Sequence, residues 1–238
     1  MFTIGKPPVK KQQVQKRKRP TQFSNVPQIY RRGPRMEIKY VDNAATDDNF
    51  NLVGGTPWIL INGVVQGAGN NQRIGNKISL KALRMKGHII NLATAVQTYG
   101  RLLVIYDKQP NGALPTYAAV MQTRDNAGAA TATAFSDPNF DNKERFTILR
   151  DTTIVFPSVT NTLGVLTNVG FDQGTKSDIN IFNVDMYIKL KGLHTSYTGA
   201  TAGIADISTG SLLFAVMIHQ GAATWTFRNV ERLTYYDN

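Results

Sequence analysis

Alternating apolar and polar positions occur in short stretches along the chain, and clusters of Gly, Asn, Asp, Thr and Pro separate one stretch from the next. This texture is typical of strands joined by turns. It predicts eight strands, at Met36–Val41, Trp58–Gln66, Ile78–Leu92, Gly100–Asp107, Arg145–Phe156, Ile181–Leu190, Ser211–His219 and Thr224–Tyr236. The best candidate for a short helix is Thr116–Arg124.

The period of two is most regular in the strand that begins at Ile181. One set of alternate side chains is apolar and comprises Phe182, Val184, Met186, Ile188 and Leu190. The other set is mainly polar and comprises Asn183, Asp185, Tyr187, Lys189 and Lys191. Because successive side chains of a strand point to opposite faces, the pattern predicts a sheet with one buried face and one polar face.

The strand that begins at Ile78 changes phase partway along. Its apolar positions run first through Ile78, Leu80 and Ala82, and then through Leu83, Met85, Gly87 and Ile89. One extra residue inserted into a strand produces such a shift. We therefore expect a β-bulge near Ala82.

The order of these elements indicates the fold class. The strands do not alternate with helices, and several are joined by long loops rich in Gly, Ala, Thr and Asn, at Asp42–Pro57, Asp125–Asn142 and Thr195–Gly210. Eight strands in an all-β chain favour two packed sheets, and eight is the number of strands in a jelly roll. We predict an all-β fold, a single eight-stranded jelly-roll sandwich over residues 36–238.

Charge separates the N-terminal end from this sandwich. The net charge is +11, and residues 1–35 hold ten Lys and Arg with no acidic residue, after which Lys39 follows Glu37. Half of the ten Pro also lie there, so the segment buries too little apolar area to offset its ordering entropy. We expect residues 1–35 to form a disordered basic arm that binds nucleic acid, since charge density attracts phosphate whatever the base sequence. Its basic residues are Lys6, Lys10, Lys11, Lys16, Arg17, Lys18, Arg19, Arg31, Arg32 and Arg35.

Two compact clusters stand out within the arm. Lys16–Arg19 is typical of a nuclear-localisation signal and equally of a phosphate-binding patch. Arg31–Arg35 lies where the arm meets the predicted sandwich, and the alternative for this cluster is a solvated linker. Phe2, Phe23 and Tyr30 lie among the basic residues, where aromatic rings could stack on unpaired bases.

Further basic side chains lie on the polar face of the strand at Ile78. They are Lys77, Lys81, Arg84, Lys86 and His88. Charged strand faces are often simply solvated, or they protect a sheet edge from aggregation. Because these residues share the sign of the arm, a phosphate-facing surface is the other interpretation. The candidate nucleic-acid-binding residues are therefore those of the arm together with Lys77, Lys81, Arg84 and Lys86.

Several function classes find no support in the sequence. The chain has no Cys, which excludes disulfides, iron–sulfur clusters, thiolate zinc sites and cysteine nucleophiles. No stretch reaches the roughly 18 apolar residues of a membrane span, so we expect a soluble, non-secreted chain without a membrane span. The three His residues have no partner at helical spacing, and no phosphate-loop or dinucleotide motif is complete. We predict no catalytic residues, no cofactor and no metal site.

Three segments resemble a known family. They are Arg73–Lys81, Leu102–Gly112 and Asn142–Asp151. The first is a basic-glycine-basic turn that enters a strand, the second is a strand that ends in an Asp-basic-x-Pro turn, and the third is an Asn/Asp-rich stretch before an Arg-Phe-x-Ile-Leu-basic strand. In this order they resemble the coat proteins of geminivirus-like, circular Rep-encoding single-stranded DNA viruses. The chain departs from plant geminiviruses in lacking any Cys.

The resemblance implies a capsid protein that self-assembles, as a homo-oligomer of about 60 copies in the simplest case, into a small icosahedral shell. It implies that the arm binds a packaged circular single-stranded DNA genome inside the virion. With the cluster Lys16–Arg19, it also suggests assembly in the host nucleus and nuclear import factors as partners.

Alternatives remain open at this point. Small RNA viruses and satellite viruses also use a jelly roll with a basic arm, and attraction to phosphate barely distinguishes RNA from DNA. A non-viral nucleic-acid-binding β-domain is a second alternative, and an enzyme is the least supported class.

Overall fold

Strands dominate the computed structural model, which describes residues 37–43, 48–50, 58–91, 98–122, 133–156, 181–219 and 225–237. In chain order the strands are β1 (Glu37–Asn43), β2 (Asp48–Phe50), β3 (Ile59–Leu60), β4 (Lys77–Asn91), β5 (Thr98–Asp107), β6 (Phe146–Phe156), β7 (Ile181–Tyr197), β8 (Ile207–Thr209), β9 (Ser211–Ile218) and β10 (Trp225–Asp237). The helices are short: α1 (Tyr117–Val120), η1 (Phe140–Asn142) and η3 (Ile204–Asp206). The predicted arm, with both of its basic clusters and its aromatic residues, lies outside the described residues.

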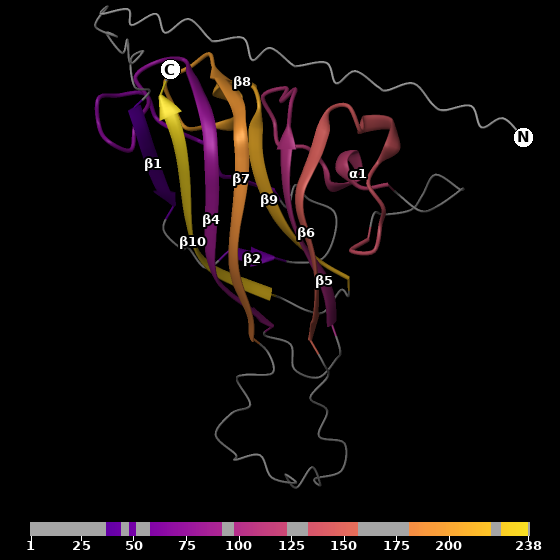
Figure 1. Ribbon diagram of the computed structural model, residues 1–238. Helices are drawn as coiled ribbons and strands as arrows, with labels where there is room; N and C mark the ends of the chain where they lie inside the picture. The colour runs from indigo at the N-terminus through magenta and orange to yellow at the C-terminus, as the bar shows by residue number, and fades with distance from the viewer. Residues whose placement is uncertain are drawn as a thin grey trace, which may run out of the picture. The chain divides into compact units, whose positions relative to one another are not determined.

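Two antiparallel sheets build the fold (Figure 1). A six-stranded sheet has the order β1-β10-β4-β7-β8, with β2 also paired to β10, and a four-stranded sheet has the order β3-β9-β5-β6. Without the short β2 and β8, the eight remaining strands follow, in chain order, the arrangement 1-8-3-6 in one sheet and 2-7-4-5 in the other. This is the connectivity of a jelly roll. The predicted all-β, eight-stranded jelly-roll sandwich is confirmed.

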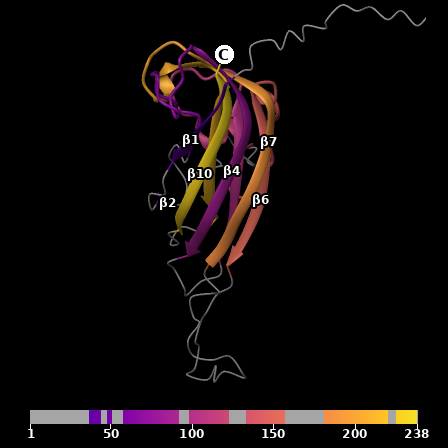
Figure 2. The ribbon, with the colours of Figure 1, turned by 60° about the vertical axis from the view of Figure 1, so that its left-hand side comes forward.

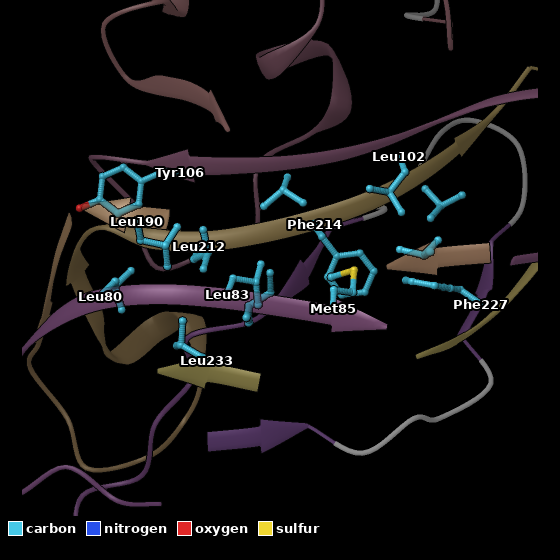
Figure 3. Packing of buried hydrophobic residues seen from close by; sticks show 14 of the residues in the cluster. Leu80, Leu83, Met85, Leu102, Tyr106, Leu190, Leu212, Phe214, Phe227 and Leu233 are labelled. Atoms are coloured by element: carbon cyan, nitrogen blue, oxygen red, sulfur yellow. The ribbon is translucent and has the colours of Figure 1, made fainter. Parts of the chain in front are cut away.

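The space between the two sheets is filled by one hydrophobic core (Figure 3). Aromatic rings meet edge to face within it: the ring centroids of Phe156 and Trp225 lie 4.7 Å apart, and those of Phe214 and Phe227 lie 5.8 Å apart. Gly100 of β5 leaves the space that the Trp225 ring occupies, because a Cβ atom at this position would overlap the ring. The packing of Trp225 therefore depends on a residue without a side chain.

β4 contains an irregularity that the sequence predicts. The register between β4 and β10 shifts between Thr234 and Tyr235, so that Lys81 is left without a paired residue. The register with β7 shifts at the same place. Gly192 of β7 lies there with a φ of 77°, a left-handed conformation that glycine adopts easily. The β-bulge expected near Ala82 is confirmed.

Two predicted elements are shorter in the structure. The strand expected at Trp58–Gln66 shrinks to β3, because the buried side chain of Asn62 replaces a regular strand pairing: its Oδ1 atom accepts a hydrogen bond from Leu212 N at 2.8 Å. The helix expected at Thr116–Arg124 shrinks to the single turn α1, because Met121 is already extended, with φ −115° and ψ 134°.

The outer side of the four-stranded sheet is covered in part by the described segments of the connection between β5 and β6, which include α1 and η1 (Figure 1). Apolar side chains of β5 and β9 pack there against Tyr117, Val120 and Phe146 in a second hydrophobic cluster. At one end of the connection, Arg145 donates hydrogen bonds of 2.9 and 2.7 Å to the buried carboxylate of Asp107. The central strands β5 and β9 are therefore buried on both faces, whereas the outer face of the six-stranded sheet is polar.

Arg73 has a structural role that the motif at Arg73–Lys81 does not reveal. The side chain is fully buried. Its guanidinium group donates to the carbonyl oxygens of Val64 at 3.0 Å and Gly75 at 2.7 Å, and also to that of Gly199. The same group lies 4.0 Å from the ring centroid of Tyr197. Arg73 thus joins the segment after β3 to the segment after β7, because its fixed fork of donors can satisfy several carbonyl groups at once.

Lys39 belongs to the sandwich, although the sequence places it at the end of the basic stretch. It lies in β1 and is buried, with its Nζ atom 2.8 Å from Asp237 Oδ2 and 3.1 Å from Gln72 O. The hydrogen bond to Asp237 raises the pKa of Lys39, although burial acts in the opposite direction. Lys39 therefore holds β1 to the last residues of β10 and is not available to an external partner.

Candidate nucleic-acid interface

The strands β10, β4 and β7 lie side by side in the six-stranded sheet (Figure 2). Basic side chains gather on the outer face of these strands. Strand alternation directs them away from the core, and each is exposed. We call this surface the basic face. Its cations are Lys77, Lys81, Arg84 and Lys86 of β4, Lys189 of β7, and Arg228 and Arg232 of β10.

Two carboxylates share this face among the described residues, Asp42 of β1 and Asp185 of β7. Asp42 accepts two hydrogen bonds of 2.7 Å from the guanidinium group of Arg232. Asp185 lies 3.6 Å from the ammonium group of Lys86. Seven cations against two carboxylates leave an excess of five positive charges. Such an excess on one surface attracts a polyanion.

The pair of Asp42 and Arg232 is ionised across the whole physiological pH range. The hydrogen bonds from Arg232 lower the pKa of Asp42 below its ordinary value, although partial desolvation acts in the opposite direction. The same hydrogen bonds raise the pKa of Arg232. Neither residue therefore gives the basic face a pH switch near neutrality.

Tyrosine rings lie between the basic side chains of this face. Tyr187 is 61% exposed and Tyr40 is 47% exposed. The guanidinium carbon of Arg232 lies 4.7 Å from the Tyr40 ring centroid, and Lys81 Nζ lies 5.5 Å from that of Tyr236. Exposed rings beside cations are the two components that surfaces for single-stranded nucleic acid combine.

The structure brings the candidates Lys77, Lys81, Arg84 and Lys86 together on one exposed face, with His88 beside them. The candidates in the arm, from Lys6 to Arg35, lie outside the described residues. Their role in nucleic-acid binding stays a prediction.

Three cations of the basic face were not among the sequence candidates: Lys189, Arg228 and Arg232. The sequence does contain a signal for these three residues. Arg228 and Arg232 share one face of the strand expected at Thr224–Tyr236, and Lys189 belongs to the polar set of the strand that begins at Ile181. What the pattern could not supply is the strand order β10-β4-β7, which places the three strands next to one another.

In the part of the chain that the structure describes, no helix has the length and apolar character needed to cross a bilayer.

The sequence profile of the geminivirus coat protein/nuclear export factor BR1 family matches residues 2–238. The chain is 28% identical over 164 residues to the capsid protein of satellite tobacco necrosis virus 1, a match that covers 69% of each chain.

Two solved structures of infectious bursal disease virus are also similar, the VP2 subviral particle with a TM-score of 0.26 and the Gt strain with a TM-score of 0.25. Both are 12% identical to the chain and match 85% of it, and the chain spans about a third of theirs (33% and 34%).

Proposed function

Since the chain belongs to the geminivirus coat protein/nuclear export factor BR1 family, we propose that about 60 copies of it assemble into a small icosahedral shell that packages a circular single-stranded DNA genome. The chain is a viral capsid protein found in the virion, and its role is structural rather than enzymatic. The number of copies and the nature of the cargo are the proposal.

The observation that carries the cargo proposal is the basic face. It provides cations on the rigid sandwich, in addition to the ten Lys and Arg of residues 1–35. In a shell of about 60 copies, ~10 arm charges per copy sum to roughly 600, against one negative charge per nucleotide of the genome. We propose that the basic face points to the interior, and that it and the arm both neutralise the packaged nucleic acid.

The tyrosines favour a single-stranded cargo. Tyr40 and Tyr187 present exposed rings beside Arg232 and Arg84. Unpaired bases can stack on such rings, whereas the bases of a duplex are already stacked on one another. The basic face therefore suits a strand whose bases are accessible.

Assembly in the host nucleus is a further part of the proposal. The cluster Lys16–Arg19 has the composition of a nuclear-localisation signal that import factors could bind. The family description, which includes nuclear export factors, is consistent with passage through the nucleus.

The second candidate is the coat protein of a small RNA or satellite virus. It is favoured by the similarity to the capsid protein of satellite tobacco necrosis virus 1. The phosphate attraction that drives packaging does not distinguish the two cargoes, so the cargo itself has to be identified.

Electron microscopy and sequencing test both candidates. The chain expressed in host cells is expected to form particles of uniform diameter that protect nucleic acid from nuclease, and sequencing of the protected material is expected to recover circular single-stranded DNA. Recovery of RNA alone would support the second candidate, and a stable monomer of 26.3 kDa would contradict the shell.

The contribution of the basic face is tested by charge reversal. Arg84→Glu is expected to weaken binding to single-stranded DNA about tenfold and to reduce the slope of log K against log salt by about 0.7, since one phosphate contact is lost. Lys108→Glu is the matched control, because it changes the charge equally at an exposed site of the β5–β6 connection, away from the basic face. Fluorescence anisotropy at several salt concentrations measures both quantities, and equal losses in the two variants would rule out a special role for this face.

A further inference from the structure

Phe140 is a large apolar side chain that the fold exposes on a rigid support. It is 71% exposed, more than any other large hydrophobic residue in the described part of the chain. It begins η1, which is tied to α1 by hydrogen bonds from Asn139 N to Val120 O at 2.8 Å and from Asn142 Nδ2 to Ala119 O at 2.9 Å. The backbone that carries the ring is therefore held in place, so little ordering entropy is lost if the ring becomes buried.

A groove lies directly beside this ring, between η1 and the start of β6. Its volume is about 380 Å³, and the exposed surface of its lining is largely apolar. Apolar side chains of its lining come from Val120, Pro138, Phe146 and Ile148, and Phe140 forms one wall. A projecting ring and an apolar groove thus occupy adjacent positions on one surface. This is the arrangement required for a contact in which two identical surfaces each insert a side chain into the other.

Residues of opposite charge, Asp141 and Lys143, lie close to Phe140 in the sequence. Lys143 Nζ lies 4.5 Å from the Phe140 ring centroid, and Asp141 is exposed next to it in the sequence. In the two-fold contact proposed below, Lys143 of one copy faces Asp141 of the other, and the reverse. Both contacts are attractive, whereas a surface with charges of a single sign would repel its own copy.

We propose that Phe140 and its groove form a two-fold contact between two copies of this chain. Each copy inserts its Phe140 ring into the groove of the other, and the pairs of Asp141 with Lys143 flank the two rings. The inference rests on the proposed function, because a shell built from identical subunits supplies the second copy. It goes beyond that function by assigning a lateral contact to η1 and the start of β6, the edge strand of the four-stranded sheet.

The ring is tested by Phe140→Ser in the full chain. Loss of a buried aromatic anchor is expected to raise the concentration needed for assembly about tenfold or more, as measured by sedimentation velocity. Ile74→Ser is the matched control, since Ile74 is 61% exposed outside this surface and is expected to leave assembly unchanged. Circular dichroism of both variants checks that the fold is retained. Normal assembly of a folded Phe140→Ser variant would overturn the proposal.

The geometry is tested by exchanging the charges. Asp141→Lys and Lys143→Asp are each expected to weaken assembly, because each puts like charges opposite one another in both halves of a two-fold contact. The double variant is expected to recover assembly, since every contact is again between opposite charges. Failure of the double variant to recover would overturn the two-fold arrangement.

Two experimental outcomes distinguish failure of the proposed function from failure of the Phe140 contact alone. A wild-type chain that forms neither particles nor dimers would contradict the proposed function together with this contact. Wild-type particles that tolerate Phe140→Ser would contradict the contact alone.

Discussion

Removal of residues 1–35 is expected to abolish most nucleic-acid binding while the sandwich remains folded. The deleted segment carries ten of the eleven net positive charges, and the chain from residue 36 onward is nearly neutral. With about 0.7 counterions released per phosphate contact on a single strand, the slope of log K against log salt is expected to fall by up to about 7. Anisotropy titrations of a labelled single strand between low and physiological salt measure this change.

The fold of the truncated chain serves as the control for the deletion. The first strand of the two sheets, β1, begins at Glu37, and the ion pair between Lys39 and Asp237 is retained in the truncated chain. Circular dichroism and the melting temperature of the truncated chain are therefore expected to match those of the full chain at high salt. A truncated chain that still packages nucleic acid as efficiently as the wild type would assign the binding to the basic face instead.

Gly100→Ala is expected to destabilise the sandwich by roughly 3 kcal/mol. The new Cβ atom would overlap the Trp225 ring and lie 2.6 Å from Met217 O, which is backbone of β9 and cannot rotate away. Trp225 is completely buried against Phe156, so its ring has no space into which it can move. Either β5 is displaced from β9 or the ring leaves the core, and both outcomes cost packing.

Gly203→Ala provides the comparison for this prediction. A Cβ atom at Gly203 would meet only Thr201 Oγ1, at 3.6 Å, which is an ordinary contact. The variant is expected to change the free energy of unfolding by no more than about 0.5 kcal/mol. Urea unfolding of both variants, followed by tryptophan fluorescence below the assembly concentration, measures the difference. Equal stabilities would show that the core around Trp225 repacks freely.

Much of the fold could be predicted from local pattern. Alternation of apolar and polar positions located the long strands, and the phase shift in the strand at Ile78 located the bulge at Lys81. Local pattern overestimated the length of two elements. Asn62 ends β3 early by taking the place of strand pairing, and an isolated apolar run around Tyr117 gives one helical turn rather than a longer helix.

The candidate site could be predicted only along one strand. Lys81, Arg84 and Lys86 follow from the alternation in β4, but Arg228 and Lys189 join them only through pairings across long sequence separations. Burial is equally hard to infer for charged residues. Arg73 and Lys39 look like surface cations in the sequence, but both are buried in the structure. Carbonyl oxygens accept hydrogen bonds from Arg73, and the carboxylate of Asp237 accepts one from Lys39.

The outer faces of the two sheets differ, so the two sides of each subunit are not equivalent. One sheet is covered in part on its outer side by the described segments of the β5–β6 connection, and the other presents seven cations to solvent. A subunit placed upside down in the proposed shell would turn its cations away from the packaged nucleic acid and its covering toward it, so electrostatic attraction would select one orientation during assembly. The nucleic acid would in this way act as a template for orientation, and every copy that it recruits would arrive with the same side facing in.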